Sequence, residues 1–461
     1  MDNTRLNQNS NEPASSSYQF FVHTFGCKVN TYDTGLIQKN LSTHGFQLVE
    51  KNISERKQSH QTPIHVLNTC AVTAEATSQA VRLIRKIKSQ DPLATVVVTG
   101  CAAQVDTGSF ENLPGANLVV ANSHKGMLPQ LLDQYFKGDL KQKVFKSNIF
   151  KKEDLEMGGG EESHHTRNFL KIQDGCNSFC TFCIIPYARG KSRSIPILQL
   201  VQKINQLVDE GAQEVVLTGV HIGDYEDMTM NRPYLLEDLI EAILKKTKIP
   251  RLRLSSLEPI ELSDRLLDLF SDDRLCPHFH MSIQSADSEV LQQMKRKYSE
   301  QDVRSCFERI REKLPNSFIG LDVIAGFPTE TDEQFENTYR VLSESPWTRM
   351  HVFPYSERQG TRAAQLPQLH TMVRKERASL LRQLSLHRLQ SEALRQVGTE
   401  KKALILNKWN TDQQGLTRDY WSVDLGLSLA EHEQYKNTEI SVLIQDVILK
   451  ENDIVLKGMV L

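Results

Sequence analysis

Three cysteines in the middle of the chain have the clearest chemical potential. Cys176, Cys180 and Cys183 form a Cys-x3-Cys-x2-Cys run in a polar loop. Thiolates this close together hold one soft metal centre, and a structural zinc site would need a fourth ligand that no neighbouring Cys or His provides. Three cysteines on a four-iron cluster leave one iron open to a small molecule with an amino and a carboxylate group. The pattern therefore predicts a cluster that binds and cleaves S-adenosylmethionine; a structural or zinc-binding role is the alternative.

Three further cysteines, Cys27, Cys70 and Cys101, lie far apart in the N-terminal part of the chain. Each follows an apolar, strand-like run within a few residues. The carboxyl ends of parallel strands open on one edge of a sheet, where ligands bind. Three thiols at that edge could bind one four-iron cluster, and one iron of that cluster would again have no protein ligand. On this argument alone, a shared cluster and small cysteines at the edge of the core are equally supported.

The elements around the first three cysteines predict parallel βαβ units. Strand-like runs at 18–24, 63–68 and 95–99 each precede a helical pattern, and 115–135 adds another strand and helix. We expect an N-terminal α/β domain at 18–138. The following stretch, 139–165, is rich in Lys, Glu and Gly and is interpreted as a linker.

A second alternating series predicts the domain that carries the central cysteines, at 166–397. Six strand candidates, at 169–173, 214–218, 251–255, 278–284, 318–324 and 351–354, are separated by amphipathic helices. They are too few for a closed eight-stranded barrel, so we expect a partly open six-stranded (βα) barrel, with a doubly wound sheet as the alternative. The cysteine run follows the first strand, where barrel enzymes place their sites. The last segment, 398–461, has short strands and polar turns that predict a small β-barrel.

The composition fits a cytoplasmic protein of several domains. The chain has 461 residues, with 55 Lys and Arg against 57 Asp and Glu, so a nucleic-acid surface would have to be a local patch. No apolar run approaches the roughly 20 residues of a membrane span, and no signal-peptide core is present. Clustered cysteines in this setting indicate metal binding. The other two, Cys276 and Cys306, are predicted to be structural.

The cysteine motifs resemble those of a known family. The run at 175–194, GCNSFCTFCIIPYARGKSRS, resembles the core of the radical S-adenosylmethionine methylthiotransferases. TFGCKVNTYDTG, LNTCAVT and VVTGCAAQ are similar to the N-terminal domain of that family, in which three cysteines hold an auxiliary 4Fe–4S cluster. The residues after Cys27 and Cys70 resemble the branch that acts on N6-threonylcarbamoyladenosine in tRNA. The resemblance implies two 4Fe–4S clusters and conversion of that nucleoside, next to the anticodon, to its 2-methylthio derivative. The implied chemistry uses one S-adenosylmethionine as methyl donor and another as the source of a 5′-deoxyadenosyl radical.

The resemblance also implies positions that contact S-adenosylmethionine. Phe182 matches an aromatic residue near the adenine, and Gly326 would admit the adenine closely because it has no side chain. The other implied positions follow successive strands: Thr218, Gly219, Ser255, Glu258, Ser282, Gln284 and Asp322. No side chain is assigned as a general acid or base.

The C-terminal segment resembles a TRAM domain, a small RNA-binding β-barrel; a β-module with a structural role is the alternative. Its turn at 415–421 would place Tyr420 and Trp421 where RNA bases stack. Arg189, Lys191 and Arg193 follow the cysteine loop and would meet phosphate, whereas the basic runs at 82–88 and 295–297 are interpreted as solvated helix faces.

The implied partners are a tRNA anticodon stem–loop, S-adenosylmethionine, an electron donor such as flavodoxin or ferredoxin, and a sulfur source, with no membrane. Two other functions stay open. One is another branch of the family, acting on isopentenyladenosine in tRNA or on a ribosomal protein. The other is a non-catalytic iron–sulfur protein that binds RNA.

Overall fold

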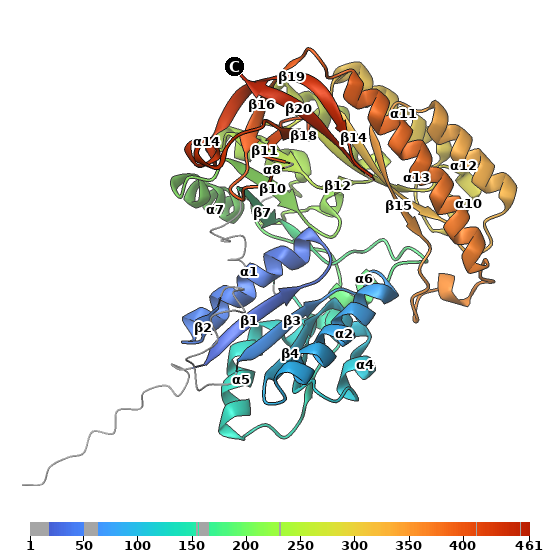
Figure 1. The fold of residues 1–461 in the computed structure, drawn as a ribbon. Coiled ribbons are helices and arrows are strands. Elements are labelled where there is room, and N and C mark those ends of the chain that lie inside the picture. The colour runs from blue at the N-terminus through green and yellow to red at the C-terminus, as the bar shows by residue number, and fades with distance from the viewer. Residues whose placement is uncertain are drawn as a thin grey trace, which may run out of the picture. The chain divides into compact units, whose positions relative to one another are not determined.

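The structure is a computed structural model that describes residues 18–49, 63–153, 155, 166–229, 232–411, 413–451 and 453–461. The chain divides into two compact units (Figure 1). The first ends at Ile149, and the second covers Phe150–Leu461 together with the short segment Val72–Ala74. No described helix is long and apolar enough to cross a lipid bilayer.

A six-stranded parallel sheet forms the centre of the first unit, in the order β2-β1-β3-β4-β5-β6. The strands are β1 (Gln19–Thr24), β2 (Gln47–Leu48), β3 (Ile64–Thr69), β4 (Thr95–Gly100), β5 (Leu118–Ala121) and β6 (Val144–Phe145). The middle strands β3 and β4 are buried along their whole length, as expected for parallel strands covered on both faces. The predicted parallel α/β fold is confirmed.

Helices follow the strands of this sheet. They are α1 (Lys28–Thr43), α2 (Ala74–Gln90), α3 (Cys101–Val105), α4 (Thr107–Glu111) and α5 (Leu128–Lys137), with a 3-10 turn η2 (Asn122–Met127) before α5. On one face of the sheet, Leu41 of α1 and Leu131 of α5 share a core with Phe20 and Val97. Strand β6 pairs with β5, although its residues fall in the stretch expected to be a linker. The sheet therefore extends past residue 138; residues 154 and 156–165 of the expected linker lie outside the described part of the chain.

The second unit contains a parallel barrel. Its strands are β7 (Arg167–Lys171), β10 (Glu214–Thr218), β11 (Arg251–Leu254), β12 (Ser256–Leu257), β13 (His278–Gln284), β14 (Phe318–Ala325) and β15 (Arg349–Pro354). They form two sheets, β11-β10-β7 and β12-β13-β14-β15, and β11 runs almost directly into β12. No pairing joins β7 to β15 among the described strands, so the barrel is open between them. This confirms the expected partly open six-stranded barrel and excludes the doubly wound alternative.

Helices connect the barrel strands, and one long helix follows the last of these strands. They are α7 (Ile197–Asp209), α8 (Leu236–Lys246), α9 (Asp264–Asp268), α10 (Ser288–Gln293), α11 (Glu300–Lys313), α12 (Asp332–Glu344) and α13 (Thr371–Leu394). Two of them begin at capping boxes, Ser299 with Asp302 for α11 and Thr331 with Gln334 for α12. Each box satisfies backbone N–H groups that the first helical turn leaves without partners, so the sequence locally defines where these helices start.

The C-terminal residues form a closed five-stranded barrel in the order β16-β17-β18-β20-β19. Its elements are β16 (Glu400–Ile405), β17 (Gly415–Thr417), β18 (Ser422–Asp424), α14 (Leu429–Tyr435), β19 (Glu439–Leu449) and β20 (Ile454–Val460). This TRAM-like barrel confirms the expected small β-barrel. Its core includes Phe318 of β14 and Leu389 of α13, so it is packed onto the parallel barrel within one compact unit (Figure 1).

A buried group of charges joins the two barrels. Glu214, the first residue of β10, accepts hydrogen bonds from Arg251 at 2.8 Å and from Arg253 at 3.0 Å. Both arginines also reach the TRAM-like barrel: Arg251 contacts Glu439 at 2.9 Å and Arg253 donates to the carbonyl of Arg418 at 2.9 Å. Burial alone would raise the pKa of Glu214, but the charges of Arg253 and Arg251 lower it to about 2. Glu214 is therefore ionised and compensates two buried cations.

The aromatic residues of the 415–421 turn lie in this joint. Trp421 is buried and packs edge-on against Phe318, with ring centroids 5.1 Å apart. Tyr420 stacks on His278 of β13 at 3.9 Å. The expectation that Trp421 offers a stacking surface to RNA is therefore wrong, because its ring is buried. Tyr420 is partly buried, and its contact with RNA stays a prediction.

We predict that Glu214→Gln lowers the free energy of unfolding by about 3–5 kcal/mol, because it leaves two buried guanidinium groups without their counter-charge. Urea unfolding followed by circular dichroism at pH 7 measures this. The pKa of Glu214 is lower in the folded state than its unfolded value of roughly 4.3. The stabilisation that ionised Glu214 provides is therefore complete above about pH 4.3 and is lost as the pH falls towards 2.

Glu241→Gln is the matched control, since Glu241 forms an exposed pair with Lys245. It should change stability by no more than about 0.5 kcal/mol. An equally small effect at Glu214 would show that the charges joining the barrels are not stabilising.

Candidate metal centres

The central cysteine loop follows the short strand β8 (Gln173–Asp174), at the carboxyl end of the first barrel strand. Gly175 approaches the next loop so closely that a Cβ atom there would lie 2.0 Å from the carbonyl oxygen of Lys191. Its φ of +78° also favours glycine. The N–H of Cys176 donates to the carbonyl of Gly190 at 3.1 Å, and Thr181 donates its N–H to Met294 at 3.1 Å. The loop is therefore held at both ends by backbone contacts.

The burial of the three thiols differs. Burial raises the pKa of Cys180 and raises that of Cys183 to about 12. Burial acts in the same direction on Cys176, but hydrogen bonds with His221 and Ser178 outweigh it and lower the pKa. Buried thiols of high pKa bind as thiolates only when a metal replaces their protons.

In neither of the two described cysteine triads are the sulfur atoms close enough together for one metal ion. In the described part of the chain, neither cysteine triad brings all three sulfur atoms within 4.8 Å of one another. A tetrahedral zinc ion would require its ligands closer together. A four-iron cluster accepts wider spacing because each thiolate binds a different iron. Both triads therefore have the donor chemistry of 4Fe–4S sites with three protein ligands.

His221 is a residue near this loop that the sequence argument missed. It lies at the start of the 3-10 turn η4 (Ile222–Asp224), with Nδ1 3.8 Å from the sulfur of Cys176 and 3.1 Å from Asp224. Its Nε2 contacts Glu261 at 2.5 Å. Burial lowers the pKa of His221, but the hydrogen bonds with Asp224, Cys176 and Glu261 outweigh it and raise the pKa. A protonated imidazole here orients the Cys176 sulfur and offsets its negative charge.

Arg296 was expected on a solvated helix face, and this expectation is wrong. Its side chain is 7% exposed and is paired with Glu258, one of the positions expected to contact S-adenosylmethionine. The guanidinium also lies 5.7 Å from the ring centroid of Phe182. Arg296 therefore places a buried positive charge beside Cys180 and Cys183. The sequence of the basic run 295–297 does not indicate which of its three side chains is buried.

The other positions expected to contact S-adenosylmethionine gather at the carboxyl ends of the barrel strands. Thr218 ends β10, with Gly219 next to it; Ser255 separates β11 from β12; Ser282 and Gln284 lie in β13, and Asp322 in β14. Asp322 already has a partner, His280, at 2.8 Å. Gly326 follows β14, and a Cβ atom there would lie 2.6 Å from Cγ of Arg374. Packing against α13 is thus enough to require glycine at 326, and the contact with adenine stays a prediction.

Two of the three cations expected to meet RNA phosphate are already engaged. Arg189 is 3% exposed and pairs with Asp174 at 2.9 Å, so the expectation for Arg189 is wrong. Arg193 is largely buried and donates to backbone carbonyls, including that of Arg189 at 3.1 Å. Lys191 is exposed. Only Lys191 stays a prediction for direct contact with phosphate.

The first three cysteines converge at one edge of the N-terminal sheet. Cys27 follows β1 and precedes α1, Cys70 follows β3, and Cys101 opens α3 directly after β4. Because β1, β3 and β4 are neighbours, their carboxyl ends meet. Cys70 and Cys101 are buried, whereas Cys27 is exposed. This is the arrangement that the strand-end argument required.

Side-chain amides hold the loops of this second site. Asn30 donates to the carbonyls of Phe25 at 2.7 Å and Thr69 at 3.1 Å, which ties the loop before Cys27 to the end of β3. Asn122 donates to the sulfur of Cys101 at 3.6 Å. Gly26 touches the site directly, since a Cβ atom there would lie 2.5 Å from the sulfur of Cys70.

Comparisons with known proteins show which families this chain is similar to. A model of the Radical SAM superfamily matches residues 170–342, and one described as Uncharacterized protein family UPF0004 matches residues 19–121. The chain is 39% identical to the Threonylcarbamoyladenosine tRNA methylthiotransferase MtaB of Rickettsia prowazekii, over 84% of this chain and 87% of that one. Identity to the protein of the same name from Aquifex aeolicus is 35%, over 92% and 98%.

A less similar relative is named for a different nucleoside. The tRNA-2-methylthio-N(6)-dimethylallyladenosine synthase of Desulfotalea psychrophila is 30% identical, over 75% of this chain and 78% of that one. Among solved structures, the radical S-adenosylmethionine methyltransferase TsrM from Kitasatospora setae superposes with a TM-score of 0.56 at 15% identity, covering 76% and 75%. That last likeness concerns the fold alone.

Two four-iron clusters predict about eight irons per chain. We expect about four after replacing Cys27, Cys70 and Cys101 by Ala, and about four after replacing Cys176, Cys180 and Cys183, because each triad holds one cluster. Iron analysis of anaerobically reconstituted protein measures this. Cys306→Ala is the control and should keep the full count, since Cys306 is buried in α11. A wild-type count near four would contradict the second cluster.

Gly26→Ala should selectively remove the cluster at Cys27, Cys70 and Cys101. Its methyl group would collide with the Cys70 sulfur, and the φ of +91° at residue 26 disfavours alanine. Iron should fall to about four per chain, as in the first triple variant. In Gly108→Ala the new methyl group meets nothing within 4 Å, so the iron content should not change. Full iron content in Gly26→Ala would argue against this close contact.

Proposed function

This chain belongs to the radical S-adenosylmethionine methylthiotransferase family, and we propose that it converts N6-threonylcarbamoyladenosine next to the anticodon of tRNA to its 2-methylthio derivative. The observation that carries this proposal is the identity to relatives named for that nucleoside, 39% and 35% over most of their length. The 30% identity to a dimethylallyladenosine synthase makes the isopentenyladenosine branch the second candidate.

The cofactors of the family, two 4Fe–4S clusters and S-adenosylmethionine, match the two cysteine triads. When bound, they supply a radical that can break a C–H bond with no acidic proton, which acid–base catalysis cannot do. The protein's own contribution is positioning and charge. His221 and Arg296 offset the thiolate charge of the central triad, while Asn30 and Asn122 hold the loops of the other triad.

The proposal also includes RNA contact near the central cysteine loop. Phe179 and Tyr187 are 39% and 43% exposed and meet edge-on, with ring centroids 6.0 Å apart. These exposed rings offer stacking to unpaired bases, and the exposed Lys191, four residues after Tyr187, offers a charge for phosphate. Single-stranded RNA loops are recognised in this way. We further propose a one-electron donor of the flavodoxin or ferredoxin type and a separate sulfur source.

Reconstituted protein should form 5′-deoxyadenosine from S-adenosylmethionine under reduction, and should produce 2-methylthio-N6-threonylcarbamoyladenosine in an anticodon stem–loop RNA that carries the precursor. Mass analysis of the nucleosides measures the product. The variant lacking Cys176, Cys180 and Cys183 is the control and should give neither compound. A product formed only from isopentenyladenosine RNA would assign the protein to the second branch, and no 5′-deoxyadenosine from a fully loaded sample would favour a non-catalytic role.

A further inference from the structure

A polar cavity of about 210 Å3 lies inside the parallel barrel, at the end opposite the cysteine loop. Its walls include the first residues of β7, β13, β14 and β15, and the TRAM-like barrel contributes Tyr420 and Trp421. Further up the wall are His280, Gly320 and His351. His280 contacts Asp322 at 2.8 Å, so the cavity reaches the level of a residue expected to contact S-adenosylmethionine.

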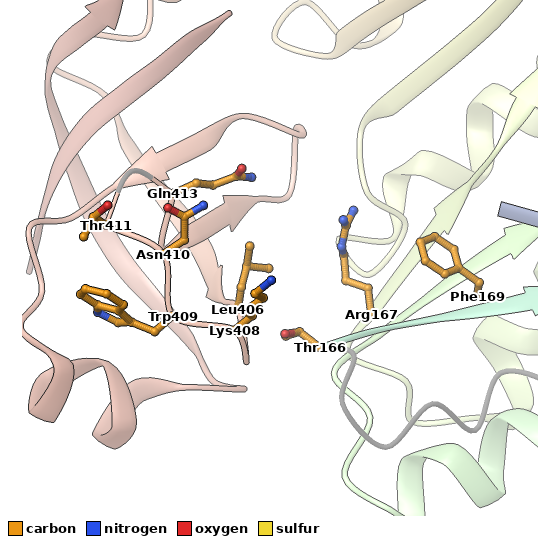
Figure 2. Close-up of a pocket in the computed structure, with 9 residues that line it drawn as sticks. All are labelled: Thr166, Arg167, Phe169, Leu406, Lys408, Trp409, Asn410, Thr411 and Gln413. Carbon is orange, nitrogen blue, oxygen red and sulfur yellow. The ribbon is translucent and has the colours of Figure 1, made fainter. Parts of the chain in front are cut away.

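A second cavity, of about 520 Å3, adjoins the first (Figure 2). It lies between β7 and the segment of the TRAM-like barrel that follows β16, and Figure 2 shows Arg167 and Gln413 on its two sides. Both of these residues also line the first cavity. The two cavities therefore meet at Arg167.

Arg167 differs from the other cations around these cavities. Arg349 pairs with Asp453 at 2.9 Å, and Arg251 and Arg253 share Glu214. Among the described residues, no carboxylate lies within ion-pair distance of Arg167 and its side chain makes no hydrogen bond. Its guanidinium lies 5.9 Å from the ring centroid of Tyr420. The charge of Arg167 does lower the pKa of Glu214, its cross-strand neighbour on β10, but Arg251 and Arg253 already hold that carboxylate. A half-buried guanidinium whose N–H groups lack acceptors therefore favours an anionic ligand.

We propose that Arg167 binds the carboxylate of the threonylcarbamoyl group, with this group extending down the barrel interior away from the cysteine loop. This inference rests on the proposed function and assigns a specificity-determining residue to it. The threonylcarbamoyl group differs from an isopentenyl group in carrying a negative charge and a hydroxyl. Arg167 offers a charge-assisted bidentate contact, and the Gln413 amide lies across from it to complete the polar surroundings.

The dimensions of the barrel allow this placement. From Lys171 to Arg167, β7 spans roughly 13 Å. A carbamoyl-threonine unit compares with two residues of extended chain, roughly 7 Å, which leaves space for the adenine ring near the cysteine end. Gly320 lines the cavity, and a Cβ atom there would lie 3.4 Å from Nδ1 of His280, so a small residue leaves more room at this level. A backbone phosphate is the other anion that Arg167 could bind, and the binding test separates the two.

The test compares binding of three anticodon stem–loop RNAs to reconstituted protein by fluorescence anisotropy. They carry threonylcarbamoyladenosine, its methyl ester, or unmodified adenosine. Wild-type protein should bind the first about tenfold more tightly than the other two, the size of one charge-assisted contact. Arg167→Gln should lose this preference while its affinity for the unmodified RNA stays the same, and Arg167→Lys should keep part of it.

Arg340→Gln, an exposed position on α12, is the matched control and should bind like the wild type. Iron content and circular dichroism show whether each variant is folded and loaded. If Arg167→Gln keeps the preference, the inference is wrong although the proposed function stands. If it weakens binding of all three RNAs equally, Arg167 contacts a phosphate and the carboxylate assignment is overturned. If wild-type protein modifies only isopentenyladenosine RNA, the proposed function fails and the inference fails with it.

Discussion

Both metal centres depend on one geometric constraint: parallel strands place all their carboxyl ends at the same edge. In the first unit this brings Cys27, Cys70 and Cys101 together, although dozens of residues separate them in the chain, because β1, β3 and β4 are neighbours. In the second unit it places the central cysteine loop and the polar residues that follow successive strands at the same end of the barrel. A change of strand order in the first sheet would separate its cysteines.

Charge compensation shapes the rest of the second unit. Near the cysteine loop, Asp174 is held by Lys171 at 3.3 Å and Arg189 at 2.9 Å, and Glu258 is paired with Arg296. At the other end, Glu214 offsets two arginines where the TRAM-like barrel packs. Buried charges persist only with such partners, so these pairs hold the barrel ends in defined geometry. Among the described residues, Arg167 forms no ion pair of its own and only shares the field of Glu214, so a ligand's negative charge would be favourable there.

Much of the architecture follows from local patterns. Strand and helix periodicity, together with the capping boxes of α11 and α12, correctly predicts a parallel α/β unit, a six-stranded open barrel and a small β-barrel. The errors share a cause. Trp421, Arg189 and Arg296 are expected at the surface from residue type and nearby sequence, but each is buried: Trp421 against Phe318, Arg189 in a pair with Asp174, and Arg296 in a pair with Glu258. Tertiary packing determines whether a polar or aromatic side chain is exposed. The local periodicity of the sequence contains no information about that packing.

The sequence by itself determined the chemistry, because the spacing of Cys176, Cys180 and Cys183 confines three thiols to one loop whatever the fold around it. Only the tertiary structure decided what surrounds those thiols. His221, 45 residues from Cys176 in the chain, comes within 3.8 Å of its sulfur. The meeting of Cys27, Cys70 and Cys101 likewise required a particular strand order, since hydrogen bonding between strands, and not separation along the chain, determines which loops become neighbours.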